Sequence, residues 1–212
     1  EKTLCYGTLN PDLIYFIEDL PEAGGDIRSN NYNIRAGGTA INCAENIANW
    51  GMSVSVLGNS IGKDALGEYL LSELKDKNIL HEEIILTDNP TPTCSIFVDR
   101  DGERTIVSSG YSNCTWNKLS EVKNFQSLLV DRYSIPNIKN SITEIKKSGV
   151  FVVQAGYEYP IDYEIDFLVD CGLFYPETKN INYEKDVKNT NRLNTQPPVS
   201  PNGISAIIIT HA

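Results

Sequence analysis

The strongest constraint on how this chain folds is the stretch from Gly37 to Gly67. Gly37-Gly38 opens a run with helical spacing of apolar residues, which ends at Trp50-Gly51, and a β-branched segment follows at Val54 to Leu57. A second glycine-rich turn then opens another helical run. This order is typical of strand-to-helix turns that let a small polar ligand approach the backbone, with Asn42 directed from the helix start.

Strand-like and helix-like segments alternate along most of the remaining chain, which predicts a mainly parallel sheet covered by helices on both faces. We expect strands at 3–6, 13–17, 32–35, 54–57, 84–86, 127–130, 150–153 and 204–210, and helices at 40–50, 65–77 and 138–147. Residues 163–169 fit either a helix or a connection, 172–175 the end of a strand, and 176–201 a helix fragment or a surface loop.

One segment of the chain has the pattern of a β-hairpin. Thr93–Val98 and Glu103–Ser108 are both rich in β-branched residues, and Asp101-Gly102 lies between them. An Asp-Gly pair between such segments is a strong hairpin signal. We expect this hairpin to belong either to a small lid or to the main sheet.

Composition excludes several classes of partner. The net charge of −10 argues against nucleic acid and against an anionic membrane surface, and no apolar run is long enough to span a bilayer. The five widely spaced cysteines contain no Cys-x-x-Cys, so we expect free thiols in the reducing cytoplasm. Two histidines leave little material for a histidine metal site. The strand-like start at Lys2 predicts no signal peptide within this chain.

Several motifs, taken in order, resemble those of the ribokinase-like (PfkB-type) carbohydrate kinase family. Gly7-x-x-Asn10-x-Asp12 resembles the family's first sugar contact, and Gly37-Gly38-x-Ala40-x-Asn42-x-Ala44 resembles its first signature. Gly58-Asn59-x-Ile61-Gly62-x-Asp64-x-x-Gly67 resembles the continuation of that signature. Gly102-Glu103-Arg104 resembles the lid strands, and Leu128 to Asp131 resembles a strand whose end lines the sugar pocket.

The resemblance implies a fold, a reaction and a set of site residues. The fold would be a single ribokinase-like α/β domain over residues 1–212, with lid segments near 13–35 and 93–108. The reaction would transfer the γ-phosphoryl group of ATP, with Mg²⁺, to a hydroxymethyl group of a sugar. The substrate-binding residues would be Asn10, Asp12, Gly37, Gly38, Thr39, Asn42, Arg104 and Asp131. Among these, Arg104 would suit an anionic substituent. A homodimer through the lid hairpin is also implied.

Two departures from the family pattern concern catalysis. The Gly-Ala-Gly-Asp motif that carries the family's catalytic base does not occur in residues 1–212, so no base is assigned. The Asn-x-x-Glu motif is also unmatched, because Glu177 and Asn180 stand in the reverse order. We therefore expect a family member that lacks its C-terminal nucleotide-binding part. A non-catalytic sugar or metabolite binder, and a nucleoside or pseudouridine kinase of the same family, stay open as alternatives.

Purely structural roles compete with the binding roles at several positions. Asp12 could serve only the turn after Asn10, and Asn42 could cap the helix start. We expect Asp64 to cap the helix that follows it, and the rings of Trp50 and Trp116 to serve in packing.

Overall fold

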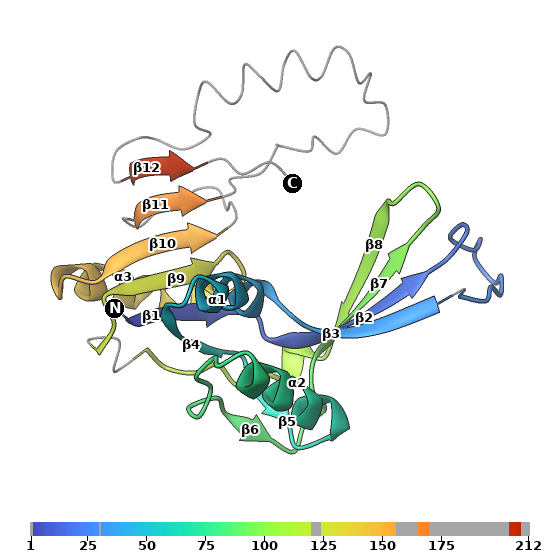
Figure 1. Cartoon of the computed structure of the whole chain (residues 1–212), viewed down its shortest axis with the longest axis horizontal. Coiled ribbons are helices and arrows are strands. Elements are labelled where there is room, and N and C mark those ends of the chain that lie inside the picture. The colour runs from blue at the N-terminus through green and yellow to red at the C-terminus, as the bar shows by residue number, and fades with distance from the viewer. Residues whose placement is uncertain (1, 30, 120–123, 156–164, 170–203, 209–212) are drawn as a thin grey trace, which may run out of the picture.

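The protein was analysed as a computed structural model, which describes residues 2–29, 31–119, 124–155, 165–169 and 204–208. Its main sheet is entirely parallel in the order β12-β11-β10-β9-β1-β4 (Figure 1). These strands are β1 (Lys2–Gly7), β4 (Ser53–Gly58), β9 (Ser127–Asp131), β10 (Phe151–Ala155), β11 (Ile165–Val169) and β12 (Ile204–Ile208).

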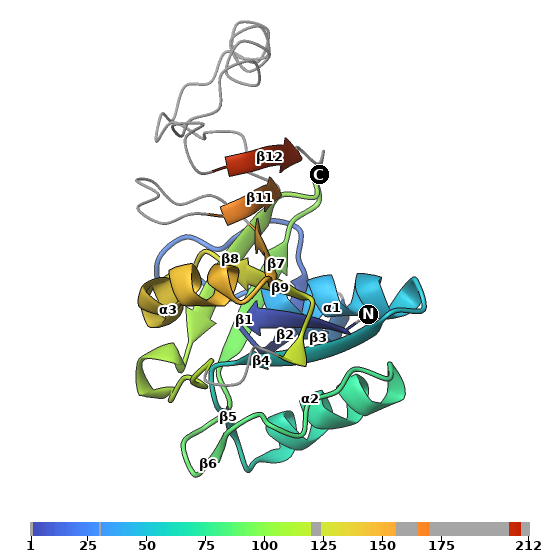
Figure 2. The same cartoon turned by 90° about the vertical axis from the view of Figure 1, so that its left-hand side faces the viewer.

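Helices cover both faces of this sheet, as the alternation of elements predicts (Figures 1 and 2). They are α1 (Thr39–Asn49), α2 (Ala65–Asp76) and α3 (Ile135–Lys147). Successive side chains of β1 point to opposite faces: Leu4 and Tyr6 pack in the core under α3, whereas Cys5 packs in the core with α1 and α2. Burial on both sides explains why Leu4, Cys5 and Tyr6 follow one another in β1 without a charged residue between them.

A second sheet of four strands projects from the main body and forms a lid (Figure 1). Its order is β3-β2-β7-β8, with β2 (Asn10–Phe16), β3 (Asn31–Gly37), β7 (Thr93–Val98) and β8 (Arg104–Ser109). The predicted hairpin is confirmed as β7 and β8. Its turn is stabilised because Asp99 Oδ1 accepts hydrogen bonds from the backbone N–H groups of Asp101 and Glu103, each at 2.9 Å.

The remaining elements are short. The two-residue strands β5 (Ile61–Gly62) and β6 (Leu86–Thr87) pair in parallel, and η1 (Tyr111–Asn113) is a single 3₁₀ turn after the lid. Within the described residues, no helix is both long enough and apolar enough to cross a lipid bilayer.

Some expectations about individual segments were wrong. The second strand begins at Asn10, so Asn10 and Asp12 lie within a strand rather than in a turn before it. Residues 165–169 form strand β11, where a helix or a connection was expected, because pairing with β10 and β12 selects the extended form. Only Leu86 of the expected strand 84–86 is in a strand, β6. The segments expected at 172–175 and 176–201 lie outside the described residues.

The two tryptophans have different environments. Trp116 packs on the core under α3, with its ring centroid 6.1 Å from that of Tyr6, as expected of a packing residue. Trp50 follows the end of α1 and is 74% exposed, so the expectation that its ring serves in packing was wrong. Trp50 lies six positions after Ala44, so it falls outside the i, i+3, i+4 spacing of the buried face of α1 and points to solvent.

Candidate active site

A cavity of about 470 Å³ lies between the lid and the start of α1. Its floor comes from the β1–β2 junction, β2 and the first turns of α1, and its roof comes from β7 and β8. The cavity is lined by Thr8, Asn10, Asp12, Gly38, Thr39, Asn42, Cys94, Ile96, Arg104, Ile106, Ser108, Tyr111, Trp116 and Tyr133. A larger cavity of about 650 Å³ beside α3 is also lined by polar groups, including Asn117, Asn137 and Glu144, but none of the predicted substrate-binding residues lines it.

A carboxylate and an amide lie at the base of the cavity. The side chain of Asn10 is buried and donates from Nδ2 to Asp12 Oδ1 at 2.7 Å. Burial raises the pKa of the Asp12 carboxyl, and the hydrogen bond from Asn10 partly offsets this. No described residue donates a hydrogen bond to Asp12 Oδ2. A partly buried carboxylate with one free oxygen is well suited to accept hydrogen bonds from sugar hydroxyls.

The two adjacent glycines leave space for this pair. A Cβ added at Gly37 would lie 2.2 Å from Asp12 Oδ2, and one added at Gly38 would lie 2.9 Å from Asn10 Oδ1 and 2.2 Å from the carbonyl oxygen of Thr8. The backbone of Gly38 also has φ 89°, which side chains disfavour. Gly38 lines the cavity, whereas Gly37 is buried behind Asp12. The glycine pair therefore permits the geometry of Asn10 and Asp12.

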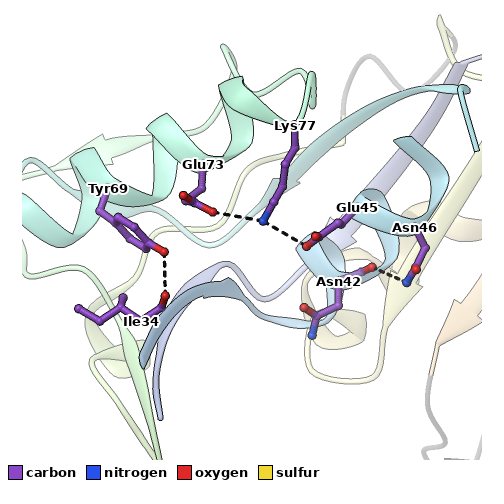
Figure 3. A network of polar contacts seen from close by, with 7 residues as sticks. All are labelled: Ile34, Asn42, Glu45, Asn46, Tyr69, Glu73 and Lys77. Carbon is purple, nitrogen blue, oxygen red and sulfur yellow. Dashed lines mark hydrogen bonds and ion pairs between the residues drawn. The ribbon is translucent and has the colours of Figure 1, made fainter. Parts of the chain in front are cut away.

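The first turns of α1 present polar groups to the cavity. Gly38 is the N-cap and offers no side chain to cap the helix, while Thr8 Oγ1 accepts a hydrogen bond from the Thr39 N–H at 3.0 Å. Asn42 lies in the next turn, so its expected alternative role as a helix cap was wrong. Figure 3 shows the side-chain amide of Asn42 directed away from Lys77, which follows α2 and forms an ion pair with Glu45 of α1 at 3.3 Å. Thr39 and Asn42 are thus free to meet a ligand in the cavity.

Asp131 was expected to line the pocket, and the structure places it elsewhere. Its side chain is fully buried at the end of β9. It accepts hydrogen bonds from the N–H and Oγ1 of Thr8, at 2.7 and 2.8 Å, and from the Ser134 N–H at 2.8 Å. Both oxygens are occupied, so Asp131 holds Thr8 in place and has no exposed surface for a ligand. Gly7 is required beside it, since an added Cβ would lie 2.5 Å from Asp131 Oδ2.

Arg104 lines the outer part of the cavity, near the tip of the lid. The residue is exposed, and no carboxylate of the described residues forms an ion pair with it. Its guanidinium is available to a ligand that reaches the roof. The apolar side chains of Ile96 and Ile106 lie on the same face of the lid and exclude water from that side.

The sequence argument missed several lining residues. Three of them lie on the same face of the lid as Asp12: Cys94, Ile96 and Ser108. The hairpin register predicts this face only if the pairing of β7 with β2 is already known. No sequence signal pointed to Tyr111, whose hydroxyl donates to Asn10 Oδ1 at 2.7 Å across 101 residues. Thr8 was missed because its role depends on the distant Asp131.

A metal site is not formed by the part of the chain that the structure describes. Among those residues, no three His, Cys, Asp or Glu side chains come together closely enough to hold an ion. The Mg²⁺ and ATP implied by the resemblance therefore have no ligands assigned in the described residues.

The arrangement of lid, glycine turn and carboxylate lies within a region that matches a known protein family. The model of the pfkB family carbohydrate kinases matches residues 1–149. The chain belongs to this family. A ribokinase from Dictyostelium discoideum is 30% identical over 122 residues, which are 57% of this chain and 38% of that protein. This chain therefore matches well under half the length of that relative.

Solved structures show the same ribokinase-like fold. A ribokinase from Arabidopsis thaliana, complexed with ribose and ATP, has a TM-score of 0.69 at 21% identity, over 98% of this chain and 70% of that one. A fructokinase from Halothermothrix orenii has a TM-score of 0.69 at 18% identity, over 100% of this chain and 80% of that one. At these identities the likeness confirms the α/β fold with its lid.

Proposed function

We propose that this chain forms the sugar-binding part of a cytoplasmic kinase that transfers the γ-phosphoryl group of ATP, with Mg²⁺, to a hydroxymethyl group of a sugar. The observation that carries the proposal is the Asp12 carboxylate, held by Asn10 at the base of a lidded cavity. Membership of the family and the ribose and ATP bound by the Arabidopsis relative support it. The unpaired state of the four described cysteines is consistent with a reducing compartment.

Binding would begin at the floor of the cavity. Asp12 Oδ2 accepts from sugar hydroxyls, and Thr39 and Asn42 supply further polar contacts at the start of α1. Ile96 and Ile106 close over the sugar and exclude water, which limits transfer of the phosphoryl group to water. Phosphoryl transfer depends mainly on such positioning, with one base to accept the hydroxyl proton. That base is not assigned to any residue of 1–212.

The identity of the sugar is the second part of the proposal. The family resemblance covers ribokinase and fructokinase relatives alike, so neither name decides the substrate. Arg104 lies on the roof and forms no ion pair with a described carboxylate, which favours a substrate with an anionic group at the end distant from Asp12. A panel of ribose, fructose, their monophosphates, a sugar acid, adenosine and pseudouridine, assayed for ADP release by the complete gene product, tests this choice.

Replacement of Asp12 tests the site itself. We expect Asp12→Ala to weaken sugar binding roughly 10- to 100-fold, because hydrogen bonds to a charged group are each worth about 1.5–3 kcal/mol. Isothermal titration of the preferred sugar into the complete gene product measures this, and sugar-dependent ADP release should fall in parallel. Asp19→Ala is the matched control, since the Asp19 carboxylate is exposed on the lid and, among the described residues, forms an ion pair with Arg100 alone.

Each outcome has a clear meaning. Sugar binding by Asp12→Ala that equals the wild type rejects the assigned site. Sugar binding by the wild type without any ADP release assigns the protein to the alternative class, a non-catalytic sugar binder. Release of ADP with a nucleoside alone assigns it to the nucleoside kinases of the family.

A further inference from the structure

Tyr111 is a lining residue with no role so far. It lies directly after the lid strand β8, in the turn η1, and follows Gly110, whose φ of 86° reverses the chain at that point. Its hydroxyl donates to Asn10 Oδ1 at 2.7 Å. A residue at the foot of the lid therefore contacts the amide that holds Asp12.

The hydrogen bonds of Asn10 admit only one orientation of its amide. Nδ2 donates to Asp12 Oδ1 at 2.7 Å and to the carbonyl oxygen of Pro11 at 3.2 Å. The Pro11 carbonyl oxygen can only accept a hydrogen bond, and so can the Asp12 carboxylate when it is ionised. The amide nitrogen of Asn10 must therefore face these two groups, and Oδ1 must face Tyr111. Asn10 is 1% exposed, so in this structure its Oδ1 depends on the Tyr111 hydroxyl for a hydrogen bond.

We propose that Tyr111 is a positioning residue of the sugar site: its hydroxyl fixes the amide of Asn10, which in turn holds Asp12 Oδ1 and leaves Oδ2 directed to the sugar. This inference rests on the proposed function of the cavity. Without the hydroxyl, Oδ1 of Asn10 is buried and unpaired, and rotation of the amide would place Oδ1 against the Asp12 carboxylate. Either change loosens Asp12.

The protonation states of Tyr111 and Asp12 agree with the hydrogen bonds from Tyr111 to Asn10 and from Asn10 to Asp12. Burial, with the nearby Cys94 and Asp12 adding to it, raises the pKa of the Tyr111 hydroxyl, so Tyr111 stays neutral and donates. Burial raises the pKa of Asp12, and the bond from Asn10 lowers it. The other titratable groups around Asp12 are Arg35, in register on β3, and Cys94, in register on β7. Arg104 lines the same cavity further out, where β8 begins opposite Val98. Weakening the Asn10 bond removes a lowering influence, so the pKa of Asp12 should rise further.

The test is Tyr111→Phe in the complete gene product. We expect KM for the sugar to rise about 5- to 30-fold while kcat changes less than about twofold and KM for ATP is unchanged. The acid limb of kcat/KM for the sugar should move to higher pH, because Asp12 is protonated more readily. A ¹³C NMR titration of the Asp12 carboxyl, without sugar, should show the same direction.

Tyr69→Phe is the matched control. The Tyr69 hydroxyl donates to the Ile34 carbonyl oxygen of lid strand β3 at 2.9 Å, on the side of α2 (Figure 3). The hydroxyl that donates to Asn10 is that of Tyr111. We expect this variant to keep the wild-type KM and pH profile, which separates orientation of Asp12 from general attachment of the lid. If Tyr111→Phe does not fold, 4-fluorophenylalanine at residue 111 fills the place of the hydroxyl without donating a hydrogen bond.

The outcomes distinguish this inference from the proposed function. Wild-type sugar KM and an unmoved acid limb in the Tyr111 variants, with sugar binding lost in Asp12→Ala, overturn the inference alone. An equal rise of KM in Tyr69→Phe and Tyr111→Phe also overturns it, since lid attachment would then explain both. Sugar binding retained by Asp12→Ala overturns the proposed function first.

Discussion

Glycine at residue 37 has a steric role that can be tested separately from its flexibility. Because an added Cβ would lie 2.2 Å from Asp12 Oδ2, Gly37→Ala must displace either the carboxylate or strand β3. We expect the affinity for the sugar to fall at least about 10-fold, as for loss of a hydrogen bond to a charged group. Isothermal titration with the complete gene product measures the change.

The control for Gly37→Ala is Gly51→Ala. Gly51 has φ 77°, but nothing lies within 4 Å of its added Cβ. That substitution should lower the free energy of unfolding by about 1 kcal/mol through backbone strain and leave sugar affinity unchanged. Equal sugar affinity in Gly37→Ala and wild type would show that Asp12 tolerates the displacement and does not need this space.

Helix α2 depends on a cap that the sequence identifies and tertiary contacts strengthen. Asp64 Oδ1 accepts from the Gly67 N–H at 2.9 Å, and the hydroxyl and N–H of Thr91 donate to the same carboxylate at 2.6 and 2.8 Å. We expect Asp64→Ala to lower the free energy of unfolding at pH 7 by about 1–2 kcal/mol. Urea unfolding measures it, and Asp76→Ala at the exposed far end of α2 should cause no loss.

The same cap has a defined pH dependence. Burial alone would raise the pKa of Asp64, but the hydrogen bonds from Thr91 and the α2 backbone lower it below 3.8. Because the pKa of Asp64 is lower in the folded protein, the ionised carboxylate stabilises the fold at pH values above the pKa of the unfolded state. This stabilisation is lost as the pH falls through the pKa of the folded state. The difference between wild type and Asp64→Ala should therefore shrink below about pH 3.8. A difference that stays constant down to pH 2 would contradict this role of the ionised carboxylate.

For the whole molecule, the lid presents an open edge. All of β8 is exposed, with Val107 54% exposed, and no strand of the described residues pairs with its outer edge. The opposite edge strand, β3, is contacted by α2 through Tyr69 and Ile34. Since open sheet edges favour pairing with another strand, we expect a homodimer through β8. Sedimentation velocity should show a dimer that Val107→Lys dissociates.

The control for association is Trp50→Lys, which removes an exposed apolar side chain outside the lid. This variant should sediment as the wild type does. A monomeric wild type at tens of micromolar, or a dimer unaffected by Val107→Lys, would exclude the lid as the contact.

Local patterns were enough to predict most elements and part of the site. Three features depend on residues within a few positions of one another: the glycine turn at Gly37-Gly38, the β7–β8 hairpin and the Asp64 cap. They can therefore be predicted from the sequence. Asn10, Asp12, Gly38, Thr39, Asn42 and Arg104 also line the cavity as the family motifs led us to expect. Their role in binding sugar stays a prediction.

By itself, the sequence determined the order of most strands and helices, the α/β class and the glycine turn, because periodicity and turn chemistry act over short distances. Only the tertiary structure decided which polar groups meet. Asp131 turned away from the cavity to hold Thr8, 123 residues distant, and Tyr111 reached Asn10 across 101 residues. Strand β11 was decided in the same way, by pairing with β10. These outcomes depend on register between distant segments, which local patterns do not contain.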